Sequence, residues 1–404
     1  MSAHNDVFVC AALRTPFGRY GGALSSIRSD DLAALPIRAL MEHHPHLDWA
    51  ALDEVILGCA NQAGEDNRNV ARMATLLAGL PLSVPAVTVN RLCASGLEAI
   101  GQAARAIALG DIDLAIAGGV ESMSRAPYVM AKASTALGRE QKLEDTTLGW
   151  RLVNPRMQQQ YGVDSMAQTA ENLAREHAVN RVDQDAYAAR SQQRALRARD
   201  AGEFADEIVA VALQDRNETR TFSADEGLRA DSTAAKLAAL KPLLGPDTTI
   251  TAGNASGIND GACAVLLASQ DAVARHALTP IARVRGMASA GVEPRTMGIG
   301  PVPAIGKLLA RINWTLADCD RIEINEAFAA QVLACTRALG LPDGAAHVNA
   351  NGGAIALGHP LGASGARLAA TAALALQRHG ERRAIVSLCV GVGQGLALAL
   401  ERVE

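Results

Sequence analysis

The chain has 404 residues, of which 49% are hydrophobic and 20% charged, an ordinary globular composition that excludes a peptide hormone and a disordered tail. Its 38 basic and 42 acidic residues leave a net charge of -4, which provides no general field for holding a nucleic acid. Seven cysteines without a C-x-x-C pair indicate neither a disulfide framework nor a zinc ribbon. We therefore expect a reducing, cytoplasmic compartment and no metal site.

The first predicted element is a strand at residues 7–13. No basic stretch precedes this apolar segment and Arg14 ends it, which is not typical of a signal peptide. The longest apolar run, residues 384–400, is interrupted by a serine, a glutamine and three glycines, so it is too broken for a membrane span. We expect no membrane partner.

Two stretches far apart in the chain resemble each other. Cys93-Ala-Ser-Gly96 and Gly362-Ala-Ser-Gly365 each open an alanine-rich helical pattern. The first pattern ends at Gly110 and the second at Gly380, and an apolar strand follows each one. This order predicts an α/β protein with a duplicated unit. The alternative is chance, because helix starts rich in alanine, glycine and serine are common.

The region between the two copies, residues 121–249, differs in character. Methionine, glutamine, arginine and aspartate increase there, and helical patterns at 167–176 and 184–201 dominate. We predict an inserted, more helical lobe. Its arginine-rich stretch at 190–199 favours a solvated helix face, with a phosphate contact as the alternative.

Cys93 lies where a strand ends and a helix begins. The partial positive charge and the unpaired N–H groups of a helix start lower the pKa of a thiol and favour the nucleophilic thiolate. The alternative is an inert small hydrophobe inside the helix. The five cysteines within apolar runs are expected in the core: Cys10, Cys59, Cys263, Cys319 and Cys335.

Three further residues could carry chemistry. His359 lies in residues 351–365, a stretch too rich in glycine to predict a helix, where a histidine is better explained as a base than by packing. Cys389 ends a strand before a G-x-G-x-G string, but another strand follows, so a dinucleotide loop is poorly supported. Asn325 closes a strand and precedes a predicted helix at 326–331, where an amide could hold a water or donate to an oxyanion.

Four sequence blocks together resemble the signature blocks of the thiolases, in that family's order. The blocks are Val89-Asn-Arg-Leu-Cys-Ala-Ser-Gly96, Asn325-Glu-Ala-Phe-Ala-Ala-Gln331, the glycine-rich 352–365 and Cys389-Val-Gly-Val-Gly-Gln-Gly395. The resemblance begins at Arg14-Thr-Pro-Phe-Gly18 and covers essentially the whole chain. In the middle region, residues 148–155 and 160–166 look most like the thiolases that act on 3-oxoadipyl-CoA in aromatic-compound degradation.

The resemblance implies an αβαβα fold with two similar halves. One half would comprise residues 1–120, completed by about 250–280, and the other residues 281–404. Residues 121–249 would form a loop lobe over the coenzyme A site. Coenzyme A and acyl-CoA would be substrates, no cofactor would be needed, and the chain would form a homodimer or homotetramer.

The resemblance also implies the roles of the reacting groups. Cys93 would attack the keto carbonyl, release acetyl-CoA and remain as an acetyl-enzyme that free coenzyme A then resolves. His359 would activate Cys93, and Cys389 would protonate the departing carbanion. One oxyanion would be held by His359 with a water on Asn325, and the other by the backbone N–H groups of Cys93 and Gly391.

Residues that match coenzyme A or acyl contacts of the family are Met166, Arg229, Leu240, Ser256, Met297, Ala327 and Phe328. Ser165 stands where acetoacetyl-CoA thiolases usually have histidine, and Leu244 replaces an aromatic residue. A terminal carboxylate on the acyl chain would need a cation, and the candidates are Arg125, Lys132, Arg156 and, favoured among them, Arg151.

Three alternatives share this architecture. An acetyl-CoA acetyltransferase or a broad 3-ketoacyl-CoA thiolase would perform the same chemistry on another acyl group. A ketosynthase would lack the second catalytic cysteine, so Cys389 argues against it. A non-catalytic carrier would not need Cys93, His359 and Cys389 together.

Overall fold

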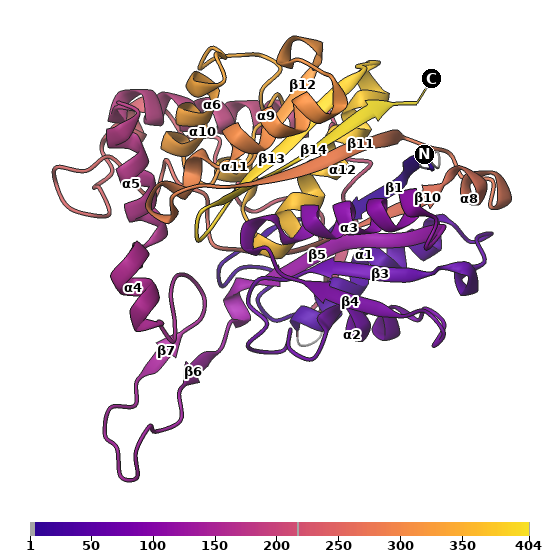
Figure 1. Ribbon diagram of the computed structural model, residues 1–404, viewed down its shortest axis with the longest axis horizontal. Coiled ribbons are helices and arrows are strands. Elements are labelled where there is room, and N and C mark those ends of the chain that lie inside the picture. The colour runs from indigo at the N-terminus through magenta and orange to yellow at the C-terminus, as the bar shows by residue number, and fades with distance from the viewer. Residues whose placement is uncertain (1–4, 216–217, 404) are drawn as a thin grey trace.

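The computed structural model describes residues 5–215 and 218–403. The main sheet follows the path β12-β13-β14-β11-β1-β10-β5-β3-β4, with β2 added beside β10, and β6-β7 and β8-β9 form two small sheets of their own. Helices α3 and α12 lie between the two halves of this path, and further helices cover the outer faces (Figure 1). The predicted αβαβα layering is confirmed.

The N-terminal half contains β1 (Val7–Arg14), β2 (Gly18–Arg19), α1 (Ser29–His43), β3 (Glu54–Gly58), α2 (Val70–Ala78), β4 (Ala86–Val89), α3 (Ser95–Leu109), β5 (Leu114–Ser122), β10 (Asn259–Ser269) and α8 (Gln270–Arg275). The inserted segment contains β6 (Tyr128–Met130), β7 (Leu143–Asp145), α4 (Pro155–Tyr161), α5 (Met166–Glu176), α6 (Arg181–Asp200), β8 (Val211–Asp215), β9 (Glu218–Phe222) and α7 (Ala234–Ala238). The C-terminal half contains β11 (Ala282–Gly291), α9 (Pro301–Ile312), β12 (Arg321–Ile324), α10 (Ala329–Ala338), α11 (Ala354–Leu357), α12 (Leu361–His379), β13 (Arg383–Val390) and β14 (Gln394–Arg402).

The strand order confirms the duplication. In the N-terminal half β3 pairs parallel with β5, and β5-β10-β1 continues antiparallel. In the C-terminal half β12 pairs parallel with β13, and β13-β14-β11 continues antiparallel. The halves join where β1 pairs with β11 at two positions, Phe8 with Arg283 and Val9 with Ala282.

The two central helices meet at glycines. A Cβ on Gly96 of α3 would lie 2.5 Å from the carbonyl oxygen of Gly362, and one on Gly365 of α12 would lie 2.5 Å from the backbone nitrogen of Leu97. Only glycine permits this approach, since real Cβ atoms do not come that near to backbone. The contact brings the beginnings of α3 and α12 together, and with them the two copies of the Ala-Ser-Gly motif.

Two sequence-based boundaries are wrong. The helix expected at 326–331 begins at Ala329, because Ser256 donates its N–H to Ala327 O (3.0 Å) and Ala255 forms a β-bridge with Phe328. These contacts hold the preceding residues extended. The glycine-rich stretch 351–365 contains one helical turn, α11, which ends where Gly358 adopts a left-handed φ of 111°.

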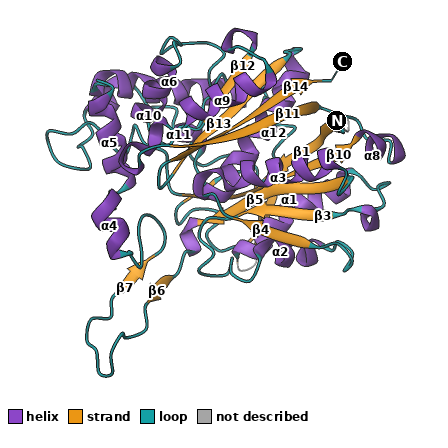
Figure 2. Cartoon of the chain, viewed as in Figure 1, coloured by secondary structure: helices purple, strands orange, loops and turns teal. Residues whose placement is uncertain are grey.

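The inserted segment packs mostly on the C-terminal half. Helices α5 and α6 lie beside α10 and α11, while the β6–β7 hairpin projects from the molecule (Figure 2). On α6, Arg194 donates to Ala345 O (3.0 Å) and Asn349 O (3.3 Å), so this arginine ties the lobe to the C-terminal half. Among the helices of the described residues, none is long and apolar enough to cross a lipid bilayer.

Candidate active site

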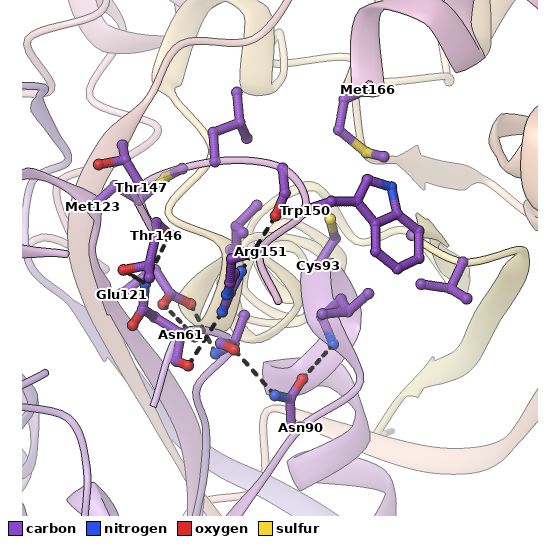
Figure 3. Close-up of a pocket in the computed structure, with 17 residues that line it drawn as sticks. Asn61, Asn90, Cys93, Glu121, Met123, Thr146, Thr147, Trp150, Arg151 and Met166 are labelled. Atoms are coloured by element: carbon purple, nitrogen blue, oxygen red, sulfur yellow. Dashed lines mark hydrogen bonds between the residues drawn. The ribbon is translucent and has the colours of Figure 1, made fainter. Parts of the chain in front are cut away.

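A cavity of about 360 Å³ opens where the strand ends of the N-terminal half meet the starts of α3 and α12. Ligands of α/β proteins commonly bind at the carboxyl ends of parallel strands. The wall of this cavity is formed by the ends of β3, β4 and β5, the turn before α3, the 146–151 loop, Met166, Leu361 and the β13–β14 turn (Figure 3). Cys93, Arg151 and Gly391 all line this cavity.

Cys93 lies in the short 3-10 turn Leu92–Ala94 that leads into α3. Burial raises the pKa of its thiol to about 11, while hydrogen bonds from the backbone N–H groups of Gly391 and Cys93 itself act to lower the pKa. The predicted lowering of the Cys93 pKa is therefore wrong, because loss of water outweighs the helix start. The same two N–H groups are the predicted donors of an oxyanion hole, and that role remains a prediction.

His359 is oriented by Ser364. The Ser364 hydroxyl donates to Pro360 O (2.9 Å), so it accepts the Nδ1–H of His359 at 2.6 Å and leaves Nε2 as an acceptor. Asn325 Nδ2 lies 3.3 Å from that Nε2, which assigns a donor role to the amide. Burial, followed by the charge of Arg367, lowers the pKa of His359 to about 3. The free protein thus carries a neutral imidazole whose Nε2 lone pair faces the Asn325 amide.

Cys389 is fully buried near the end of β13. Burial is the main cause that raises the pKa of its thiol well above the usual value, and the neighbouring Cys93 adds to this effect. A thiol in this state holds its proton at neutral pH and can donate it. The cysteine packs in an apolar cluster with Met166, Met297, Ala327 and Phe328, all of which were sequence candidates.

The structure does not bring every candidate into the cavity wall. His359, Asn325 and Cys389 are at most 5% exposed and do not line it. Within residues 5–215 and 218–403, the hydrogen bonds do not include one between Cys93 and His359. Activation of Cys93 by His359 remains a prediction. Asn325 Oδ1 is buried without a hydrogen-bond partner among the described residues, which leaves it able to accept from a water.

Of the candidates for coenzyme A or acyl contacts named from the family, only Met166 lines the wall; Met297, Ala327 and Phe328 lie in the cluster around Cys389. Three others lie elsewhere. Arg229 and Leu240 are exposed, and Ser256 is attached to the site through its N–H bond to Ala327 O. Leu244 is partly buried. Their contacts with coenzyme A remain predictions.

Ser165 and three of the four candidate cations are placed differently from expectation. Ser165 is exposed and caps α5 by accepting the N–H of Gln168 (3.2 Å), whereas the next residue, Met166, lines the cavity. Arg125 forms an ion pair with Glu65, with an N···O distance of 2.5 Å. Lys132 and Arg156 are exposed and lie outside the wall. Only Arg151 of these cations lines the cavity.

Glu121 was missed by the sequence reasoning. It ends a fully buried strand and lines the cavity, where its carboxylate accepts the N–H groups of Ala60 (3.0 Å), Asn61 (3.0 Å) and Gly362 (2.8 Å). Burial raises its pKa to about 7. The carboxylate thereby connects the end of β3, the end of β5 and the start of α12.

Glu121 also belongs to a buried group with Cys59 and Asp66, whose ligand-type atoms lie within 4.8 Å of one another. The Asp66 carboxylate accepts N–H groups from Gln62 (3.1 Å) and Gly64 (2.9 Å), and the Cys59 thiol lies 3.5 Å from it. These partners give the group a structural role in shaping the loop after β3.

Sequence comparison decides the family. Residues 7–271 match the thiolase N-terminal domain, and residues 278–402 match the thiolase C-terminal domain. The chain belongs to the thiolase family. This thiolase is 65% identical to the beta-ketoadipyl-CoA thiolase of Pseudomonas aeruginosa over 398 residues, which cover 98% of this chain and 99% of that relative.

Two further relatives extend the comparison. The 3-oxoadipyl-CoA/3-oxo-5,6-dehydrosuberyl-CoA thiolase of Escherichia coli is 59% identical, over 98% of this thiolase and 100% of that protein. The human mitochondrial 3-ketoacyl-CoA thiolase in complex with CoA superposes with a TM-score of 0.91 at 41% identity, covering 100% of both chains. Both the predicted thiolase fold and the acyltransferase class are confirmed.

Proposed function

We propose that this thiolase cleaves 3-oxoadipyl-CoA with coenzyme A into succinyl-CoA and acetyl-CoA, a step of aromatic-compound degradation. The observation that carries the proposal is identity of 59–65% over nearly the whole chain to relatives named for that substrate. Binding of coenzyme A is supported by the human thiolase complex. The alternative of an acetyl-CoA acetyltransferase is not favoured by these relatives.

Atom balance specifies the covalent intermediate. When the Cys93 sulfur bonds to the keto carbon C3, the C2–C3 bond breaks and its electron pair leaves with the two-carbon acetyl-CoA fragment. The four carbons that stay on Cys93 form a succinyl thioester, which coenzyme A then resolves as succinyl-CoA. The acetyl-cysteine expected from the sequence belongs to turnover of acetoacetyl-CoA, and succinyl-cysteine replaces it here.

The protonation states suit this division of labour. His359, whose Nε2 carries no proton, takes the proton of Cys93 and passes it to the Cys389 thiolate that the first half-reaction leaves. In the second half-reaction His359 takes the coenzyme A proton and returns it to the departing Cys93 sulfur. Cys389 delivers a proton to C2 of the departing fragment, because burial keeps its thiol protonated. The net transfer moves the coenzyme A proton to C2, and the enzyme regains its initial state.

The developing oxyanions need separate donors. The N–H groups of Cys93 and Gly391, which interact with the Cys93 sulfur, would stabilise the oxygen on C3. The thioester enolate of acetyl-CoA would be stabilised by His359 together with a water held by Asn325.

The test is a substrate comparison with purified enzyme. We expect kcat/KM for 3-oxoadipyl-CoA to exceed that for acetoacetyl-CoA by at least about tenfold, or roughly 1.4 kcal/mol of transition-state binding. Succinyl-CoA and acetyl-CoA should form in equal amounts. A preference for acetoacetyl-CoA would overturn the proposal.

We also propose that the enzyme is a homo-oligomer. The edge strand β4 and the neighbouring α2 expose large apolar side chains, Met73 (39%), Leu76 (40%), Leu77 (41%) and Val87 (38%). A second copy would cover both the apolar side chains and the unpaired strand edge. Light scattering after size exclusion should give at least the mass of a dimer, and a monomer at micromolar concentration would contradict this.

A further inference from the structure

The cavity beside Cys93 is lined by few charged side chains. Among the described residues of its wall, Arg151 is the one cation and Glu121 the one carboxylate. Glu121 already accepts three backbone N–H groups, from Ala60, Asn61 and Gly362. The carboxylate is therefore occupied, and the guanidinium is the group that a charged ligand would meet.

The hydrogen bonds that the Arg151 side chain donates are weak. Its guanidinium donates to Gly149 O and Asn61 O at 3.4 Å each, the long limit for a hydrogen bond, and both acceptors are neutral. The ion pairs of residues 5–215 and 218–403 do not include Arg151, whereas Arg125 in the same lobe pairs with Glu65. Figure 3 shows the Arg151 side chain within the cavity region that also contains Cys93 and Glu121.

The loop that carries Arg151 is held from both sides. Asn61 Nδ2 donates to Thr146 O (2.9 Å) before it, and Leu152 N donates to the Glu144 carboxylate (2.6 Å) after it. Trp150 also donates through Nε1 to Asp164 O (3.3 Å). An anchored loop presents its cation without a large ordering cost when a ligand binds.

The substrate chemistry requires such a cation. In 3-oxoadipyl-CoA the free carboxylate lies three carbon–carbon bonds from the carbon that Cys93 attacks, so the cavity that contains Cys93 must also receive the carboxylate. The charge stays on the enzyme through both half-reactions, because succinyl-Cys93 retains it. Desolvating a carboxylate without a partner is strongly unfavourable, and the arginine fork matches carboxylate geometry with two parallel hydrogen bonds.

We infer that Arg151 binds the terminal carboxylate of the acyl chain and selects dicarboxylic 3-oxoacyl groups over neutral ones. The inference rests on the proposed function and adds its specificity-determining residue. A neutral acyl chain of equal length would contact the same apolar residues, among them Met123, Leu148 and Met166, but would form no ion pair with the guanidinium.

The experiment compares two substrates of the same carbon number, 3-oxoadipyl-CoA and 3-oxohexanoyl-CoA, which carries a methyl group in place of the carboxylate. In Arg151→Gln we expect kcat/KM for 3-oxoadipyl-CoA to fall about 10- to 100-fold, as for loss of a charge-assisted pair, while 3-oxohexanoyl-CoA changes less than about threefold. Arg156→Gln is the matched control, since that arginine is exposed and outside the wall, and it should leave both values unchanged.

The outcomes separate the two proposals. If wild-type enzyme does not cleave 3-oxoadipyl-CoA, the proposed function fails. If it turns over both substrates equally well, the proposed function stands and the selection of dicarboxylic chains by Arg151 is overturned. If wild type prefers 3-oxoadipyl-CoA but Arg151→Gln keeps that ratio, whether by losing nothing or by losing both activities equally, only the role of Arg151 is overturned. Should Arg151→Gln not fold, Arg151→Lys carries the test, because lysine keeps the charge without the fork and should reduce the substrate ratio by an intermediate factor.

Discussion

The two repeats begin their central helices with the same residues, Ala-Ser-Gly, and use them differently. In the first copy the Ser95 hydroxyl stays within its own turn, accepting the N–H of Arg91 (2.9 Å) and donating to Leu92 O (2.7 Å). In the second copy the equivalent Ser364 donates to Pro360 O and accepts from the ring of His359. One backbone arrangement thus carries the proposed nucleophile in one half and the proposed base in the other.

The difference follows from available space. The position equivalent to Cys93 in the second copy is Gly362, where a Cβ would lie 2.2 Å from Val120 O and 2.7 Å from Gly58 O. No second cysteine fits there, so the residue before the turn, His359, supplies the chemistry. A duplicated scaffold therefore diverges at the positions where packing admits a side chain.

The largest expected effect comes from removing the nucleophile. Cys93→Ala should lower kcat by at least about three orders of magnitude, because no covalent intermediate can form. Mass spectrometry of wild type incubated with succinyl-CoA should find a succinyl group on the peptide that contains Cys93. Cys319→Ala, a buried thiol elsewhere, is the control that should retain activity. A succinyl label on Cys389 would contradict the assignment.

Cys389→Ser should separate the two half-reactions. We expect C–C cleavage to fall by about 10²- to 10⁴-fold, the usual contribution of a general acid, since a serine hydroxyl is a far weaker acid than a thiol. Exchange of the succinyl group between succinyl-CoA and labelled coenzyme A should persist, because it needs Cys93 and His359 but no proton transfer to carbon. Equal loss of cleavage and exchange would show that Cys389 does not act separately.

The two serines provide a direct test of the divergence. Ser364→Ala frees the His359 ring and should lower kcat/KM by about 10- to 100-fold, with a changed pH–rate profile. Ser95→Ala should instead lower the free energy of unfolding by about 1 kcal/mol, because it leaves the partly buried Arg91 N–H without its acceptor. If both variants change the pH profile alike, the two turns share one role.

A smaller effect concerns the pH dependence of Cys93. Its pKa of about 11 means that only a small thiolate fraction exists at neutral pH, so alkylation by iodoacetamide should be slow and accelerate as pH rises towards 11. The rate should increase about tenfold per pH unit below the pKa. Alkylation that levels off near pH 8 would show that the N–H groups outweigh burial.

The smallest expected effect is that of Glu121→Gln. The wild-type carboxyl has a folded pKa near 7, above the ordinary 4.5, so it favours folding at low pH and loses that contribution as pH rises through 7. The stability of the variant relative to wild type should therefore increase between about pH 4.5 and 7, measured by urea unfolding. Alkylation of Cys93 should also shift to slightly lower pH, since the Glu121 charge raises the Cys93 pKa. A flat stability difference would contradict the raised pKa.

The sequence predicted local features better than tertiary ones. The sequence correctly predicted that the two central helices end at Gly110 and Gly380, because glycine readily adopts the left-handed conformation at a helix end. Their φ values are 80° and 65°. The four thiolase blocks located the reacting residues for the same reason, since short-range motifs specify turns.

Burial could not be derived in the same way. The Cys93 pKa depends on the water excluded by distant segments, and the start of α10 depends on a bridge to Ala255, far along the chain. Glu121 did leave a signal, a lone carboxylate that follows seven apolar or glycine residues in β5, which argues for a buried polar partner.

The glycine contact between α3 and α12 has a consequence for how this enzyme can vary. Cys93 and Arg151 come from one repeat and its insertion, whereas His359, Cys389 and Gly391 come from the other. Their relative alignment depends on the contacts of Gly96 with Gly362 and of Gly365 with Leu97, where backbone atoms of the two helices approach closely. A substitution far from the cavity that tilts one central helix would misalign nucleophile and base while leaving every reacting group intact.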